Sequence, residues 1–193
     1  MKMTVLVACE YSGIVRDAFR KRGHLAMSCD LREADAGPEW HFQGDVRDPL
    51  KNIVWDLIIA FPPCNHLSSV GARHWAQKEA DGRQRRAIEF VKMLADAPAE
   101  RIAIENPTGI LTRAWRAPDQ IFHPYMFGEP WFKRTCLWLK NLPPLEHTRV
   151  VKPKGHWVQQ GTPREGLVPG RRGPKIRART FAGVARAMAE QWG

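Results

Sequence analysis

The chain has 193 residues, of which 44% are hydrophobic and 26% charged, a composition typical of one soluble globular domain with its own core. Its apolar runs fall well short of the roughly 20 residues that a membrane helix needs, and the run at residues 4–9 is too short for a secretion signal. We therefore expect a cytoplasmic protein without a membrane partner. Its four cysteines share no C-x-x-C spacing, so we expect neither a disulfide framework nor a metal site.

The charge is strongly positive and unevenly distributed. The formal net charge is +10, and residues 149–179 contain nine basic residues against one acidic residue, Glu165. The same stretch is rich in glycine and proline, which is typical of an extended arm. Such an arm suits contacts with the phosphates of a nucleic acid. The alternative is a solvated linker.

Short apolar segments alternate along the chain with segments of helical spacing. The apolar segments predict strands at residues 2–9, 24–29, 40–42, 55–60, 101–104 and 135–139. Helical spacing predicts helices at residues 15–22, 77–95 and 181–192, the last with Thr180 as its N-cap. Strands that alternate with helices predict an α/β fold, in which a mostly parallel sheet carries helices on both faces.

Five polar side chains stand where predicted strands end. They are Glu10, Asp30, Asp45, Cys64 and Glu105. In an open α/β sheet, ligands bind beyond the carboxyl ends of the strands. We therefore expect these five side chains to outline one cleft.

The acidic residues of this group suggest a nucleoside cofactor. Asp30 follows the turn Tyr11-Ser12-Gly13 by about 20 residues, the place from which a carboxylate accepts the hydroxyls of a ribose. The turn has one glycine and no G-x-G-x-x-G pattern, which argues against a pyrophosphate and favours S-adenosylmethionine. Asp45 would either accept the adenine amino group or cap a turn.

Cys64 is the candidate nucleophile. It follows Phe61-Pro62-Pro63, and the two prolines prevent the loop from continuing as strand or helix. The alternative is an inert buried thiol. Glu105, at the end of another strand, is placed to act as a proton donor, or else to form a helix cap or salt bridge. Asn106 after it is interpreted as structural.

These motifs resemble those of a known enzyme family. P-P-C-N-x-L-S-x-x-G at residues 62–71 resembles the P-P-C-Q-x-F-S-x-x-G signature of the C5-cytosine DNA methyltransferases, and E-N-P at residues 105–107 is similar to their E-N-V motif. The block at residues 127–134 is similar to their Q-x-R-x-R block, with Arg134 as the matching arginine. The resemblance implies a Rossmann-like sheet that binds S-adenosylmethionine, with the closing helix packed beside the cofactor.

The resemblance also implies a reaction. Cys64 would attack C6 of a cytosine, Glu105 would hold and protonate N3, and Arg134 would steady the activated base. C5 would take the methyl group of S-adenosylmethionine, and loss of the C5 proton would then expel Cys64. A cytosine in a duplex would first have to be flipped out. The cofactor contacts implied are Glu10, Tyr11, Ser12, Gly13, Asp30, Asp45, Phe61 and Pro62.

The chain departs from the family most clearly in lacking a large target-recognition domain. We predict a catalytic domain at residues 1–141, a basic arm at residues 142–179 and a closing helix at residues 180–193. DNA is the expected partner, recognised with short or relaxed sequence preference, or by a homodimer. Trimmed forms of this family are carried by phages, which implies a phage or bacterial origin. The expected DNA contacts are Arg73, His74, Arg171, Arg172, Lys175, Arg177 and Arg179.

Other functions remain open at this point. An amino-methyltransferase that acts on adenine N6 or cytosine N4 would place an aromatic residue after Pro-Pro, where this chain has Cys64. A non-catalytic DNA-binding or decoy protein would keep the fold and lose the chemistry. RNA or a free nucleotide as the methyl acceptor is a further alternative.

Overall fold

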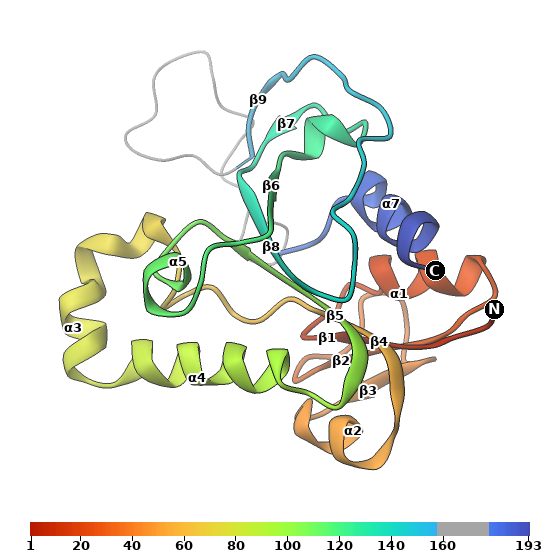
Figure 1. Cartoon of the computed structure of the whole chain (residues 1–193), viewed down its shortest axis with the longest axis horizontal. Helices are drawn as coiled ribbons and strands as arrows, with labels where there is room; N and C mark the ends of the chain where they lie inside the picture. The colour runs from red at the N-terminus through yellow and green to blue at the C-terminus, as the bar shows by residue number, and fades with distance from the viewer. Residues whose placement is uncertain (158–177) are drawn as a thin grey trace.

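The fold is built on a central seven-stranded β-sheet, seen in a computed structural model that describes residues 1–157 and 178–193 (Figure 1). The strands are β1 Thr4–Ala8, β2 Leu25–Asp30, β3 His41–Gln43, β4 Trp55–Ala60, β5 Ala99–Pro107, β6 Gln120–Phe122, β7 Trp131–Phe132, β8 Thr135–Lys140 and β9 Gly155–His156. The order in the main sheet is β3-β2-β1-β4-β5-β8-β6. The first five of these pair in parallel, and β8 is antiparallel to both β5 and β6.

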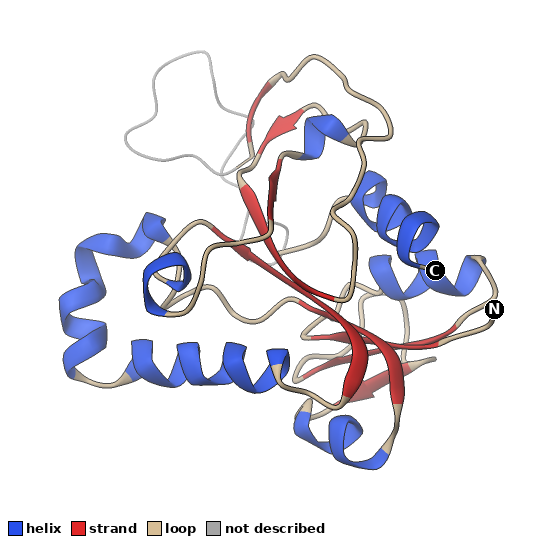
Figure 2. Ribbon diagram, viewed as in Figure 1, coloured by secondary structure: helices blue, strands red, loops and turns tan. Residues whose placement is uncertain are grey.

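Helices cover both faces of this sheet (Figure 2). They are α1 Ile14–Lys21, α2 Arg47–Asn52, α3 Trp75–Ala80, α4 Arg83–Ala95, α5 Leu111–Ala114 and α7 Ala182–Trp192, with 3-10 turns η1 Ser69–His74 and η2 Pro124–Met126. No helix in the described ranges has the length and apolar character needed to span a bilayer.

Alternate residues of each central strand pack into two separate hydrophobic cores. Val5 and Val7 of β1 belong to the core that contains α1 and α7, whereas Leu6 and Ala8 belong to the core that contains α2, α4 and α5. A strand buried on both faces is hydrophobic at successive positions, which is why the runs in β1 and β4 were readable from the sequence. The predicted α/β class, a mostly parallel Rossmann-like sheet with helices on both faces, is confirmed.

Two details of the predicted helices are wrong. The single helix expected at residues 77–95 is two helices, because Gly82 adopts a left-handed backbone conformation (φ 75°) between α3 and α4. Gly tolerates this conformation and so ends one helix and begins the next. Thr180 is not the N-cap of α7. That position is Phe181, which makes no capping hydrogen bond through its side chain.

A small second sheet stands beyond the ends of β6 and β8 (Figure 1). In it, β7 pairs in parallel with β9, with Trp131 opposite Gly155 and Phe132 opposite His156. The chain between β8 and β9 is held against the body of the protein at Leu145, a buried residue. Its backbone nitrogen donates to Gln120 Oε1 and its carbonyl accepts from Gln120 Nε2, each at 2.7 Å.

Candidate active site

The carboxyl ends of the parallel strands bring the predicted polar residues to one edge of the sheet. Asp30 is the last residue of β2 and Glu105 lies near the end of β5, while the other three follow β1, β3 and β4. Because these five strands are adjacent and parallel, the five residues lie along one edge of the sheet.

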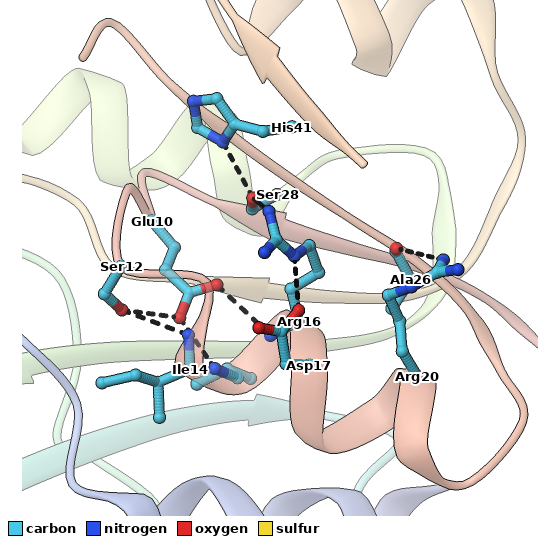
Figure 3. Close-up of polar contacts among 10 residues, drawn as sticks. Glu10, Ser12, Ile14, Arg16, Asp17, Arg20, Ala26, Ser28 and His41 are labelled. Atoms are coloured by element: carbon cyan, nitrogen blue, oxygen red, sulfur yellow. Dashed lines mark hydrogen bonds and ion pairs between the residues drawn. The ribbon is translucent and has the colours of Figure 1, made fainter. Parts of the chain in front are cut away.

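Glu10 holds the turn between β1 and α1 (Figure 3). Its Oε1 accepts hydrogen bonds from the Ser12 hydroxyl at 3.0 Å and from the Val15 backbone nitrogen at 2.8 Å. Its Oε2 accepts from the Arg16 backbone nitrogen at 3.3 Å. Burial raises the pKa of this carboxyl and outweighs the opposing effect of these hydrogen bonds. Glu10 therefore caps α1 and fixes the shape of the turn that the sequence predicts to contact the cofactor.

This turn requires a glycine at position 13 for steric and conformational reasons. Gly13 has a φ of 73°, and a Cβ there would lie 2.6 Å from the Arg16 guanidinium. Tyr11 beside it is buried, and the Arg32 guanidinium stands over its ring at 5.2 Å. The predicted cofactor residues from Glu10 to Gly13 therefore form one rigid turn.

A buried polar network behind this turn was not recognised from the sequence (Figure 3). Arg16 is 3% exposed, and its Nε donates to Asp17 Oδ1 at 2.8 Å. Its Nη1 donates to the Ser28 hydroxyl at 3.2 Å, which is hydrogen-bonded in turn to His41 Nδ1 at 2.8 Å. The network fastens α1 to β2 and β3. A basic residue in an amphipathic helix gives no sequence signal for this role.

Asp30 and Asp45 each cap a turn at the same edge. Asp30 Oδ1 accepts from the Arg32 backbone nitrogen at 2.9 Å. Asp45 accepts from the Arg47 backbone nitrogen at 2.9 Å and forms an ion pair with its guanidinium at 2.7 Å. The backbone hydrogen bond is the main reason that the pKa of Asp45 is lowered. Of the two roles predicted for Asp45, the turn cap is the one seen.

The loop that carries Cys64 is fixed at both ends. The Phe61 backbone nitrogen donates to the Ala8 carbonyl at 2.9 Å, which continues the β4 pairing. The Cys64 carbonyl accepts from the backbone nitrogens of Leu67 and Ser68, each at 3.0 Å, and the Leu67 side chain is buried. Cys64 itself is half-buried at this tight turn.

Residues at the end of β5 and just after it clamp this loop from the side. Asn106 Nδ2 donates to the Pro62 carbonyl at 2.8 Å, which confirms the structural interpretation of Asn106. The Ser69 backbone nitrogen donates to the Thr108 carbonyl at 2.9 Å. Gly109 lies so close to the loop that a Cβ there would overlap the Leu67 carbonyl. The Cys64 loop and the Glu105 strand therefore form one unit.

Glu105 has a cationic neighbour that the sequence did not single out. Lys133 Nζ lies 3.5 Å from Glu105 Oε1, and the two side chains are 17% and 15% exposed. Arg134, the residue matched to the family motif, is exposed. The sequence shows two adjacent basic residues, Lys133 and Arg134. Which of them contacts Glu105 depends on the pairing of β5 with β8, which has no local sequence signal.

Two cavities flank the loop that carries Cys64. The first, of about 10 Å³, lies between the loop and α7, and its lining includes Phe61, Glu105 and Lys133. The second, of about 240 Å³, is lined by Pro63, His66, Arg83, Arg86, Ala87 and Phe90. The Arg47 guanidinium, which pairs with Asp45, stands 5.6 Å from the ring of Phe90, one of the residues that line the second cavity.

The predicted DNA-binding residues are only partly described. Arg73 and His74 are exposed in η1, and Arg73 Nε donates to His74 Nε2 at 3.0 Å. Arg179 forms an ion pair with Asp35 at 2.5 Å. Four further predicted contacts lie outside the described residues: Arg171, Arg172, Lys175 and Arg177.

Comparison with known proteins finds likenesses among solved structures. No protein-family model matches the sequence, and no curated protein does. The S. pombe Dnmt2 methyltransferase is 13% identical, with a TM-score of 0.45 over 75% of this chain and 51% of that chain. A Spodoptera frugiperda DNMT2 mutant is 14% identical (TM-score 0.48, covering 90% and 62%), and the Entamoeba histolytica methyltransferase EhMeth is 13% identical (0.46, 78% and 58%). The chain spans less than two thirds of the length of each.

Proposed function

We propose that the chain transfers a methyl group from S-adenosylmethionine to C5 of cytosine in DNA, through a covalent adduct at Cys64. The observation that carries this proposal is the clamp between the two loops. The Asn106–Pro62 hydrogen bond joins the loop of the thiol to the strand of Glu105, so a nucleophile and an acid are held in one rigid unit. Preorganisation of this kind is what a two-residue covalent mechanism needs.

The residues at the sheet edge fit the proposed cofactor. Asp30 presents a carboxylate at the end of β2, where it would accept the two ribose hydroxyls. The cavity of about 240 Å³ is lined by Pro63 and Phe90 but also by Arg83 and Arg86, and none of the predicted cofactor residues lines it. The capped turn at Glu10 and Gly13 leaves no glycine-rich cradle for a pyrophosphate. A nucleoside without phosphate matches this donor set.

The chain's own residues would carry the acceptor chemistry. The Cys64 thiolate would form a bond to C6 while Glu105 delivers a proton to N3, which makes the ring an electron-rich enamine at C5. When bound, S-adenosylmethionine supplies an electrophilic methyl group to that carbon. Loss of the C5 proton to a base from solvent would then form the C5–C6 double bond and expel the Cys64 thiolate, and N3 would return its proton to Glu105. Lys133 would hold the Glu105 carboxyl in place during these steps.

A trapping experiment tests the proposal. DNA that contains 5-fluorocytosine is mixed with the protein and S-adenosylmethionine, because fluorine at C5 cannot leave as a proton and the adduct persists. We expect a denaturation-resistant complex with the unchanged protein and with Cys29→Ala, whose thiol is buried in β2. Cys64→Ser should give none. Failure to form an adduct, together with failure to incorporate methyl groups into any DNA, would reject the enzyme and favour a non-catalytic DNA-binding protein.

A further inference from the structure

A compact surface of aromatic and basic side chains surrounds the small sheet. We call it the β7–β9 face and define it as residues 131–134 and 149–157 together with His123 and Tyr125. The two ranges contain five basic residues and no acidic one. These basic residues are Lys133, Arg134, Arg149, Lys152 and Lys154.

The rings of this face form an ordered stack. Phe132 lies parallel to His156, with centroids 5.2 Å apart and an interplanar angle of 28°. Tyr125 and His123 meet Phe132 edge-on, at 5.3 and 5.7 Å. His156 is exposed, so it is the outermost ring of the stack and is supported from beneath by Phe132.

The stack is fixed to the rest of the protein. The Trp157 backbone nitrogen donates to the Phe132 carbonyl at 2.8 Å, and the Lys154 nitrogen donates to the Pro130 carbonyl at 2.9 Å. The Trp157 ring packs edge-on against Phe181 at 4.6 Å, next to the start of α7. The face is therefore a rigid platform, which limits the entropy that is lost when a ligand binds.

This platform adjoins the candidate active site. Lys133 belongs to the β7–β9 face and also contacts Glu105 at 3.5 Å. A DNA strand whose cytosine reached Glu105 would place its neighbouring nucleotides against the aromatic rings and lysines of the β7–β9 face.

We propose that the β7–β9 face binds the single-stranded DNA that flanks the target cytosine, with one base stacked on His156. The proposal rests on the proposed function, because it takes the acceptor to be a cytosine in DNA. Positive charge interleaved with aromatic rings is the combination that recognises unpaired strands. Two strands of two residues each are too short to enter a major groove, so the face does not suit the reading of a duplex. An unpaired cytosine also avoids the energy needed to flip a base out of a duplex.

Binding of labelled DNA to the full chain tests this without requiring catalysis. Fluorescence anisotropy is measured with a single strand of about 12 nucleotides, within the usual site sizes, with its duplex and with the matching RNA. We expect the single-stranded DNA to bind most tightly. His156→Ala should weaken it about tenfold, whereas His156→Phe, which keeps a ring, should stay within about twofold. Lys152→Met and Lys154→Met should each lower the salt dependence, by about 0.7 in the slope of log affinity against log salt.

Matched variants separate stacking from damage to the fold. Trp40→Ala removes an exposed ring next to β3, at the opposite edge of the sheet, and should leave DNA binding unchanged. Phe132→Leu keeps apolar volume but removes the supporting ring, and should weaken binding like His156→Ala. The melting temperature of each variant is measured in parallel.

Three results would overturn the proposal: equal affinity of His156→Ala and the unchanged protein, tighter binding of the duplex, or a preference for RNA. None of them depends on adduct formation at Cys64. Adduct formation without single-strand preference would leave the enzyme standing and reject this surface. The reverse result would reject the enzyme and leave the face as a single-strand-binding surface without a target cytosine.

Discussion

Asn106 donates a hydrogen bond from Nδ2 to the Pro62 carbonyl at 2.8 Å, across the gap between the acid strand and the nucleophile loop. The amide is buried, and water cannot replace the bond without a rearrangement. We expect Asn106→Ala to lower the free energy of unfolding by about 1–3 kcal/mol, because the Pro62 carbonyl loses its partner. The rate of methyl transfer should fall by about 100-fold if the loop shifts by 1 Å, with unchanged affinity for S-adenosylmethionine.

Gln191→Ala is the matched control for this prediction. It removes a half-buried side-chain amide that donates to the Glu146 carbonyl at 2.9 Å and accepts from the Glu146 backbone nitrogen at 2.7 Å, away from the site. Urea denaturation and single-turnover methyl transfer are measured for both variants. If both lose stability and neither loses rate, the Asn106–Pro62 bond does not position the loop.

Gly109 offers a second test of the same clamp. We expect Gly109→Ala to lower the free energy of unfolding by about 1–3 kcal/mol, because the new Cβ would overlap a backbone carbonyl that cannot move aside cheaply. Gly71→Ala, in η1, would meet the flexible end of Lys78 at 3.2 Å and the Asn65 carbonyl at an ordinary contact distance of 3.9 Å, and should change stability by less than about 0.5 kcal/mol. If the two substitutions lowered the free energy of unfolding equally in urea denaturation, the close contact between Gly109 and the Cys64 loop would not contribute to stability.

The main sheet was predictable because its central strands are buried on both faces. β4 at Trp55–Ala60 was predicted to the residue, and β1 and β2 to within a few residues. β5 is longer than expected, since its last residues Glu105–Pro107 pair with Leu137–Thr135 of β8. That pairing is a contact between distant segments and has no local signal.

The placement of the candidate site residues was predictable only where a residue type and a strand end coincide. Cys64, Asp30 and Glu105 meet that condition. Lys133 does not, because its ion pair with Glu105 arises from the crossing of β8 beside β5. The break between α3 and α4 did have a signal, the Asp81-Gly82 pair, in which Asp81 Oδ1 accepts from the Arg83 backbone nitrogen at 3.1 Å.

The four thiols should differ sharply in reactivity. Burial raises the pKa of Cys9 and of Cys29 to about 12, and that of Cys136 to about 11. A raised thiol pKa lowers the thiolate fraction at any given pH, so at pH 8 a thiol of pKa 12 is ionised in roughly one molecule in ten thousand. We expect iodoacetamide to modify the half-buried Cys64 first in the folded protein, as read by peptide mass mapping.

Two controls are the pH dependence of iodoacetamide labelling and the labelling of the unfolded protein. Labelling of the three raised-pKa thiols should increase as the pH approaches their pKa, and all four should react in denaturant, where burial is lost. Modification of Cys9 ahead of Cys64 at neutral pH would contradict the assignment of Cys64 as the nucleophile.

Lys133 and Arg134 are adjacent, and their substitutions should have different effects. Lys133→Met removes the cation 3.5 Å from Glu105 and should slow adduct formation by about 10- to 100-fold, because a charge-assisted contact to the acid is lost. Lys133→Arg should restore most of the rate. Arg134→Met removes an exposed charge and should mainly weaken DNA binding, seen as a higher KM with a similar kcat. Affinity for S-adenosylmethionine and melting temperature serve as controls for folding. If Arg134→Met abolishes adduct formation while Lys133→Met does not, the family-based role of Arg134 stands and the ion pair between Lys133 and Glu105 is only structural.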